Sequence, residues 1–218
     1  DLKCEKGDRI AMMLPNVLQY PIAICGALRA GMVVVNTNPM YTARELRHQL
    51  GDSGAKVILV LDNFAHTVAE VRKDTPVKHV ITTSLGDLLG FPKSLITNFV
   101  VKHVKKMVPA FSIDGAIRFN DALARGKGKS MPRLEVSASD IAFLQYTGGT
   151  TGVAKGAMLT HRNMIANMQQ ASAWISGGMT EGEEVIVTAL PLYHIFALTA
   201  NCLTFMKIGG LNHLITNP

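Results

Sequence analysis

The sequence predicts an α/β fold in which largely parallel sheets are flanked by helices. Short apolar segments alternate with segments of helical periodicity from residue 9 to residue 83. One short segment, residues 32–36, is dense in valine, as expected of a parallel strand that is covered on both faces. The alternation resumes at Asp140. Alternating strands and helices favour parallel pairing because each parallel connection needs a crossover.

The first part of the chain contains a regular series of predicted elements. An apolar strand over residues 9–14 leads through Pro15 and Asn16 into a helix that ends near Gly31. Thr42 and Glu45 have the spacing of a capping box, which predicts the start of the next helix. The other predicted features are strands over residues 32–36, 56–61 and 77–83, the end of the second helix at 52–54, and a helix over 64–73.

The second part of the chain begins less regularly. Residues 84–133 show weak periodicity and predict an insertion or subdomain connection that ends in a flexible run over 125–130. The elements predicted after it are strands over 141–146 and 184–190 and helices over 161–175 and 195–208. The sequence starts at Asp1 and ends on a pattern typical of a strand entering a turn, so we expect an interior piece of a longer protein.

The composition limits the classes of partner. Of the 218 residues, 48% are hydrophobic and 17% are charged, which supports a sizeable core and argues against gross disorder. The net charge of +6 favours anionic partners. Aromatic residues are not interleaved with basic clusters, so no nucleic-acid partner is expected. Cys4, Cys25 and Cys202 lie far apart, which suits a reducing cytosol and argues against a disulfide framework or a thiolate metal site.

Two long stretches without Asp, Glu, Lys or Arg need an interpretation. Residues 10–28 and 185–206 are each long enough to cross a bilayer. Prolines and polar residues interrupt both of them, including Pro15 in the first and Pro191 in the second. Each is therefore predicted to be a buried strand, a turn and a packed helix.

The segment with the clearest chemical meaning is a glycine- and threonine-rich loop after the strand predicted over 141–146. Glycines let backbone N–H groups approach phosphate oxygens, hydroxyls add donors and one of them suits Mg²⁺, and a lysine adds positive charge. A helix-forming segment is expected after the loop, at the sheet edge where α/β folds bind ligands. The pattern is neither a Walker A loop nor a GxGxxG motif. The candidate phosphate-binding residues are Tyr146, Thr147, Gly148, Gly149, Thr150, Thr151, Gly152, Lys155 and Gly156.

A flexible surface turn is the alternative interpretation of this loop. Its eleven residues hold three threonines, four glycines and one lysine directly after a buried strand. A solvent loop would be expected to carry Ser, Asn, Asp or Pro instead. The phosphate-binding interpretation is therefore favoured.

Residues 146–163 resemble the signature phosphate loop of the acyl-adenylate-forming superfamily, and a second motif over 190–198 is similar to the one that borders the acyl pocket in those enzymes. The resemblance covers essentially the whole chain and is closest to bacterial long-chain fatty-acid–CoA ligases. Gly148 and Ala154 stand where many relatives have serine and proline, and the threonines and the lysine are kept. The resemblance implies that residues 1–218 are part of the N-terminal AMP-binding (adenylation) domain, without the small C-terminal domain.

The resemblance also implies roles for individual residues. Thr147 would lie near Mg²⁺ and the ATP phosphates, while residues 148–152 and Lys155 would surround the departing pyrophosphate. His194 would lie beside the acyl carboxylate and the adenylate as the candidate catalytic residue. Without the resemblance, a histidine in this position is more often a satisfied core residue. The other histidines lack metal-ligand spacing and are interpreted as incidental: His48, His66, His79, His103, His161 and His213.

The implied reaction uses ATP, Mg²⁺, coenzyme A and a fatty acid. The carboxylate attacks the α-phosphorus of ATP, pyrophosphate leaves, and the CoA thiolate then attacks the acyl carbon. No protein nucleophile is required, which agrees with the lack of a convincing Ser-His-Asp or Cys-His arrangement. Two other classes stay open: a different adenylating enzyme that uses an aryl or amino acid, and a non-catalytic membrane-associated module that keeps the fold.

Residues 93–108 have an amphipathic pattern if they are helical. Ile96, Val104 and Met107 share a face with Val100, and lysines 102, 105 and 106 cluster opposite. One interpretation is docking on an anionic membrane, which would place a cytoplasmic protein at the inner face of the cytoplasmic membrane. The favoured interpretation is an ordinary surface helix with a solvated basic face.

Overall fold

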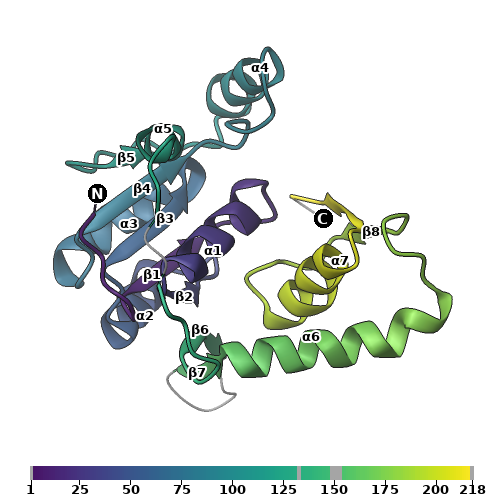
Figure 1. Cartoon of the computed structure of the whole chain (residues 1–218). Helices are drawn as coiled ribbons and strands as arrows, with labels where there is room; N and C mark the ends of the chain where they lie inside the picture. Colours follow the sequence, from purple (N-terminus) through teal and green to yellow (C-terminus); the bar gives the residue numbers. More distant parts are fainter. Residues whose placement is uncertain (1, 132–133, 148–153, 217–218) are drawn as a thin grey trace.

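A twisted, mostly parallel sheet is the main structural unit in the computed structural model, which describes residues 2–131, 134–147 and 154–216. The sheet lies to one side, with α6 (His161–Ile175) and α7 (Thr204–Lys207) extending away from it (Figure 1). All its neighbouring strands pair in parallel except the last two, which are antiparallel. The α/β prediction is therefore confirmed. The strand order is β5 (Ile117–Arg118), β4 (His79–Thr83), β3 (Val57–Leu61), β1 (Arg9–Met13), β2 (Val33–Asn36), β6 (Ile141–Thr147) and β7 (Lys155–Thr160).

Helices cover both faces of this sheet because side chains of successive strand residues point in opposite directions. On β1, Met12 packs in the core cluster that contains Tyr20 of α1 (Gln19–Arg29). Met13 packs in the opposite cluster with Leu46 of α2 (Ala43–Ser53) and Val68 of α3 (Ala65–Val71). The central strand is thus buried on both sides, which explains its uninterrupted apolar sequence.

The predicted helix boundaries follow from local capping. The Thr42 hydroxyl accepts from the Glu45 amide at 3.4 Å, and the Glu45 carboxylate accepts from the Thr42 amide at 2.8 Å. This completes the capping box at the start of α2, and Gly54 ends the helix with φ +62°. A similar box at Thr160 begins α6. The bounds of α6 agree with the predicted helix, although its cap was not identified from the sequence.

Residues 84–131 are more regular than the sequence predicts. They contain α4 (Lys93–Phe99), which continues into the π-helical turn η3 (Val100–Val104), and then β5 and α5 (Phe119–Gly126). β5 has only two residues, too few for a hydrophobic period to show, and it joins the sheet beside β4. α5 runs into the stretch 125–130 that the sequence predicts to be a flexible run.

The segment between the glycine-rich loop and the predicted helix contains a strand that the sequence does not predict. Residues 155–160 form β7, which pairs antiparallel with β6. The helix begins only at His161. Half of β7 is exposed, so its residues lack the apolar run that marks a buried strand.

The two charge-free stretches are not single helices. Residues 10–28 form most of β1 and α1, and residues 185–206 form β8 (Val185–Thr188), η5 (Ala197–Leu203) and most of α7, so the order of strand, turn and helix is as predicted. The prediction of a buried strand is wrong for β8, because Val185 and Val187 are exposed. β8 pairs in parallel with β9 (Leu211–Leu214) in a second, small sheet. Within the part of the chain that the structure describes, no helix is both long and apolar enough to cross a membrane. The described residues also form short 3₁₀ turns: η1 (Asp62–Phe64), η2 (Arg72–Asp74) and η4 (Ser176–Gly178).

Candidate functional site

The candidate phosphate loop connects the ends of β6 and β7. Thr147 pairs with Lys155, and Tyr146 pairs with Gly156, across the antiparallel ladder. The side chains of Thr147 and Lys155 are exposed, at the carboxyl end of β6 and next to β2. The candidates Gly148, Gly149, Thr150, Thr151 and Gly152 lie outside the described residues. The described ends of the loop therefore bring one hydroxyl and one ammonium group to the edge where open α/β sheets bind ligands.

Tyr146 anchors the first end of the loop to α2. Its hydroxyl donates to Asp52 Oδ2 at 2.5 Å. Burial, followed by this hydrogen bond, holds the pKa of Tyr146 well above its ordinary value, so the phenol stays neutral and remains a donor. A Cβ on Gly156 would lie 2.9 Å from a carbon of the Tyr146 ring. Glycine is thus required at 156 because the tyrosine ring lies directly against the backbone of β7.

His48 is a residue at the loop that the sequence did not identify. Because His48 lacks metal-ligand spacing from other candidate ligands, the sequence predicts no functional role for it. In the structure, however, its Nε2 lies 3.1 Å from the carbonyl oxygen of Ala154. A carbonyl can only accept, so the imidazole donates in this contact. His48 is on α2, 106 residues before Ala154. No local sequence pattern could have revealed this pair.

His194 lies in the turn just before η5. Its amide donates to the Pro191 carbonyl at 3.0 Å, and its ring lies against that of Tyr193 with centroids 4.9 Å apart. The side chain is exposed, so the interpretation as a satisfied core histidine is wrong. His194 is accessible to a ligand from the surface of the described chain.

Asn16 holds the motif at 190–198 against the end of β1. Its Nδ2 donates to the carbonyls of Thr188 and Leu190 at 2.9 and 3.0 Å, and its Oδ1 accepts from the Leu192 amide at 2.8 Å. Asn16 is 3% exposed. A single buried side chain thus joins the turn after β1 to the motif at 190–198, a role that only the tertiary structure reveals.

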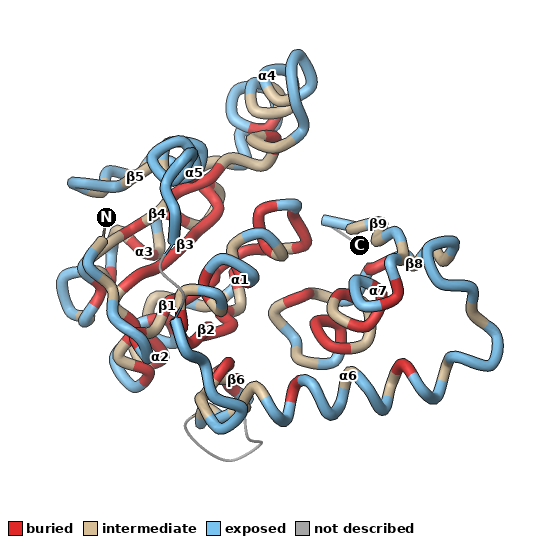
Figure 2. Tube along the Cα trace, viewed as in Figure 1, coloured by how far each residue is buried: buried red, intermediate tan, exposed pale blue. Residues whose placement is uncertain are grey.

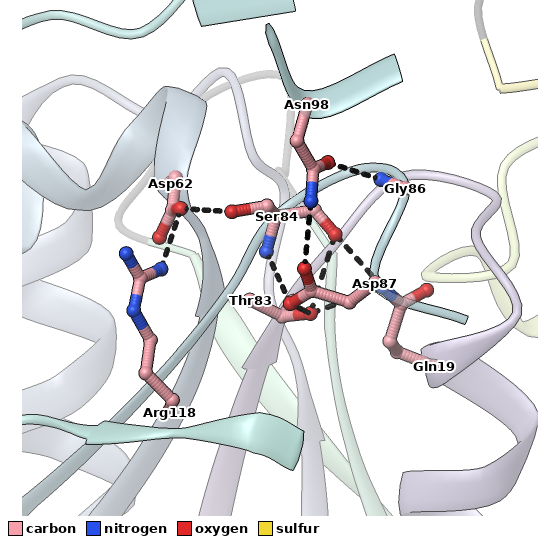
Figure 3. A network of polar contacts seen from close by, with 8 residues as sticks. All are labelled: Gln19, Asp62, Thr83, Ser84, Gly86, Asp87, Asn98 and Arg118. Carbon is pink, nitrogen blue, oxygen red and sulfur yellow. Dashed lines mark hydrogen bonds and ion pairs between the residues drawn. The ribbon is translucent and has the colours of Figure 1, made fainter. Parts of the chain in front are cut away.

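A second polar cluster lies at the carboxyl ends of β3 and β4 (Figure 3). Asp62 accepts from Ser84 Oγ at 2.5 Å and from Arg118 Nη1 at 2.8 Å. This hydrogen bond raises the pKa of Arg118. Asn98 of α4 accepts from the Gly86 amide at 2.7 Å and donates to Asp87 at 3.0 Å. The cluster connects α4 and β5 to the sheet, and strands β1 and β2 separate it from β6.

The described residues offer a limited metal site. In residues 2–131, 134–147 and 154–216, no group of three His, Cys, Asp or Glu side chains could hold a metal ion. Thr147 can supply one neutral oxygen. This suits Mg²⁺, which commonly binds through one or two protein ligands together with substrate phosphates and water.

Comparisons with known proteins agree with this architecture. The model of the AMP-binding enzyme family matches residues 1–218. The chain is 58% identical over 217 residues to a long-chain-fatty-acid–CoA ligase of Salmonella typhimurium, covering 100% of this chain and 39% of that protein. It is 38% identical over 208 residues to a protein of the same name from Bacillus subtilis, covering 94% and 36%.

The fold has counterparts among solved structures. ATP-bound MatB from Rhodopseudomonas palustris superposes with a TM-score of 0.76 at 22% identity, covering 100% of this chain and 37% of that one. The chain thus spans about two fifths of the length of the relatives it matches. From the family match over its full length and the similarity to these ligases, the chain belongs to the AMP-binding enzyme family.

Proposed function

We propose that the complete protein is an AMP-forming long-chain fatty-acid–CoA ligase. The observation that carries this proposal is the 58% identity, along the whole chain, to a relative of that name. The chain would be part of the large N-terminal adenylation domain, and the small C-terminal domain would lie outside it. The coverage of 39% of that relative supports this assignment.

The reaction would proceed in two steps. A carboxylate oxygen of the fatty acid attacks the α-phosphorus of ATP, the bond to the bridging oxygen breaks, and pyrophosphate leaves. The thiolate sulfur of CoA then attacks the acyl carbon of the acyl-adenylate, and AMP leaves. Both steps release an anion, so positive charge and N–H donors at the phosphates lower the barrier.

Individual residues would divide this work. Lys155 and the backbone of residues 148–152 would stabilise the departing pyrophosphate, and the Thr147 hydroxyl would help hold Mg²⁺, which supplies further positive charge there. Tyr146 and Gly156 would hold the loop through the packing described above. His194 would lie beside the acyl carboxylate, where an imidazole can donate a hydrogen bond to it.

The test is acid-dependent ATP–pyrophosphate exchange by the complete protein. We expect exchange that rises along a series of fatty acids of increasing length. Exchange with aryl or amino acids instead would identify a different adenylating enzyme. Lys155→Ala and Thr147→Ala should each lower exchange at least tenfold, because the first removes a charged donor to the phosphates and the second removes an oxygen that would help hold Mg²⁺. A non-catalytic module would show no exchange in any of these proteins.

We also propose that the protein is cytoplasmic and contacts the inner face of the cytoplasmic membrane through α4 and η3. An ordinary surface helix would pack its apolar face on the protein. Within α4 and η3 only Val101 is buried, while Phe99 and Val104 are 60% and 64% exposed, and Phe91, just before α4, is 85% exposed. In Figure 2, most of the segment labelled α4 has the colours of exposed and intermediate residues. α4 also projects away from the sheet (Figure 1).

The charge around this helix favours an anionic surface. Residues 88–113 contain no Asp or Glu, and the lysines of this stretch are all exposed: Lys93, Lys102, Lys105 and Lys106. Exposed aromatic and aliphatic side chains flanked by lysines are typical of a segment that lies in the lipid interface. Each lysine near an anionic membrane contributes about 1 kcal/mol to binding.

Vesicle sedimentation of the complete protein tests this contact. Vesicles of phosphatidylcholine with phosphatidylglycerol should bind it, and the triple substitution Lys102→Glu, Lys105→Glu and Lys106→Glu should weaken binding at least about a hundredfold. The matched control reverses three exposed lysines elsewhere, Lys73, Lys78 and Lys127, and should bind like the wild type. Equal binding by both triple variants would contradict the proposal.

A further inference from the structure

A buried chain of polar groups connects β6 to the segment that carries His194. Asn36 and Gln145 are neighbours on β2 and β6, and they are 3% and 6% exposed. Asn36 Nδ2 donates to Gln145 Oε1 at 2.8 Å, and Gln145 Nε2 donates to the carbonyl of Tyr193 at 3.1 Å. The fully buried Tyr20 hydroxyl donates to Asn36 Oδ1 at 2.8 Å. The chain therefore runs from α1 across two strands to the residue before His194.

The direction of every hydrogen bond in this chain follows from its last acceptor. The Tyr193 carbonyl can only accept, so Gln145 must present its amide nitrogen there and its oxygen to Asn36. Asn36 must then donate to Gln145 and accept from Tyr20. Burial holds the pKa of Tyr20 well above its ordinary value, so its hydroxyl remains a donor. Neither amide can flip without leaving a buried group unsatisfied, which locks the arrangement.

The functional consequence of this fixed hydrogen-bond arrangement depends on the position of Gln145. Gln145 directly precedes Tyr146 and Thr147, where the candidate phosphate loop begins. The carbonyl that it holds belongs to the peptide bond between Tyr193 and His194. We propose that Gln145 is a positioning residue that sets the placement of the acid-binding motif relative to the phosphate loop, an inference that rests on the proposed ligase function.

This placement matters because adenylation joins two separately bound substrates. The fatty-acid carboxylate would be bordered by residues 190–198, and the ATP phosphates by residues 146–156. The attacking oxygen must approach the α-phosphorus in near-attack geometry, and a misplacement of about 1 Å costs about a hundredfold in rate. Loss of the Gln145 donor frees the Tyr193 carbonyl without removing any proposed contact to ATP or to the fatty acid.

The experiment compares two buried glutamines in the complete protein. Gln145→Met keeps the approximate side-chain volume and removes both amide contacts. Gln49→Met is the matched control, because Gln49 is 1% exposed and donates to the Asn36 carbonyl at 2.9 Å rather than to the 190–198 segment. We expect both variants to lose thermal stability. Only Gln145→Met should lower the kcat of fatty-acid-dependent ATP–pyrophosphate exchange, by about a hundredfold, with the KM for ATP nearly unchanged.

A second variant covers the case in which Gln145→Met does not fold. The triple substitution Tyr20→Phe, Asn36→Leu and Gln145→Met removes every side-chain partner in the chain together, which leaves no unpaired side-chain amide or hydroxyl among them. It should fold and show the same loss of kcat.

The outcomes separate the two proposals. Wild-type kcat in a folded Gln145→Met or triple variant overturns the positioning role and leaves the ligase function intact. An equal loss of kcat in Gln49→Met also overturns it, because the effect would then be general destabilisation. No fatty-acid-dependent exchange in the wild type overturns the ligase function and the positioning role together.

Discussion

Replacing Asn16 should loosen the segment that carries His194. In Asn16→Ala, the Leu190 carbonyl and the Leu192 amide lose their side-chain partner, whereas the Thr188 carbonyl keeps its bond from the Ile215 amide at 3.0 Å. The Leu192 amide is buried, so leaving it unpaired costs about 1–3 kcal/mol, whereas Leu190 is 52% exposed and its carbonyl can bind water instead. We therefore expect a total loss of about 1–3 kcal/mol. Asn16→Asp should be equally harmful, because a carboxylate cannot donate to the two carbonyls.

The assay is hydrogen exchange of peptides that cover residues 185–198, together with the thermal midpoint of unfolding. Both Asn16 variants should exchange faster in this region and unfold at lower temperature. The control is Asn120→Ala, since Asn120 is exposed and makes one long hydrogen bond of 3.3 Å to the Asp87 carbonyl. If residues 185–198 exchange no faster in Asn16→Ala than in Asn120→Ala, Asn16 does not anchor the motif and the reasoning is wrong.

Three further predictions concern the loop and the helix after it. The pKa of Tyr146 is raised in the folded state, so its contribution to stability is complete below pH 10 and is lost as the pH rises further. The difference in the free energy of unfolding between the wild type and Tyr146→Phe, measured by urea unfolding, should therefore shrink above pH 10. Gly156→Ala should destabilise the protein by about 1–3 kcal/mol in the same assay, because the new methyl group would contact the Tyr146 ring at 2.9 Å. Thr160→Ala should cost about 1 kcal/mol and lower the thermal midpoint, since it removes the cap of α6.

Local chemistry accounts for the elements that the sequence predicts well. The valines of β2 and the alternating faces of β1 mark strands that are covered on both sides. Thr42 and Glu45 mark the start of α2 because their reciprocal hydrogen bonds involve neighbours along the chain. The short strand β5 and the half-exposed strand β7 are not predicted from the sequence, because neither shows a clear periodic pattern of apolar residues.

The candidate site also combines features that the local sequence indicates with contacts that it does not. The residue types of the loop and its position after a buried strand are enough to indicate phosphate chemistry. The contacts of His48 with Ala154 and of Tyr146 with Asp52 join residues about a hundred positions apart. No periodicity encodes such contacts, so they emerge only when the strands are placed side by side.

By itself, the sequence determined the alternation of strands and helices, the capped start of α2 and the residue types of the glycine-rich loop, because each depends on residues that are close together in the chain. The tertiary structure decided the strand order, the antiparallel pairing of β7 and the polar chain from Tyr20 through Gln145 to Tyr193. These features depend on burial, which forces distant polar groups to find partners with one another instead of with water.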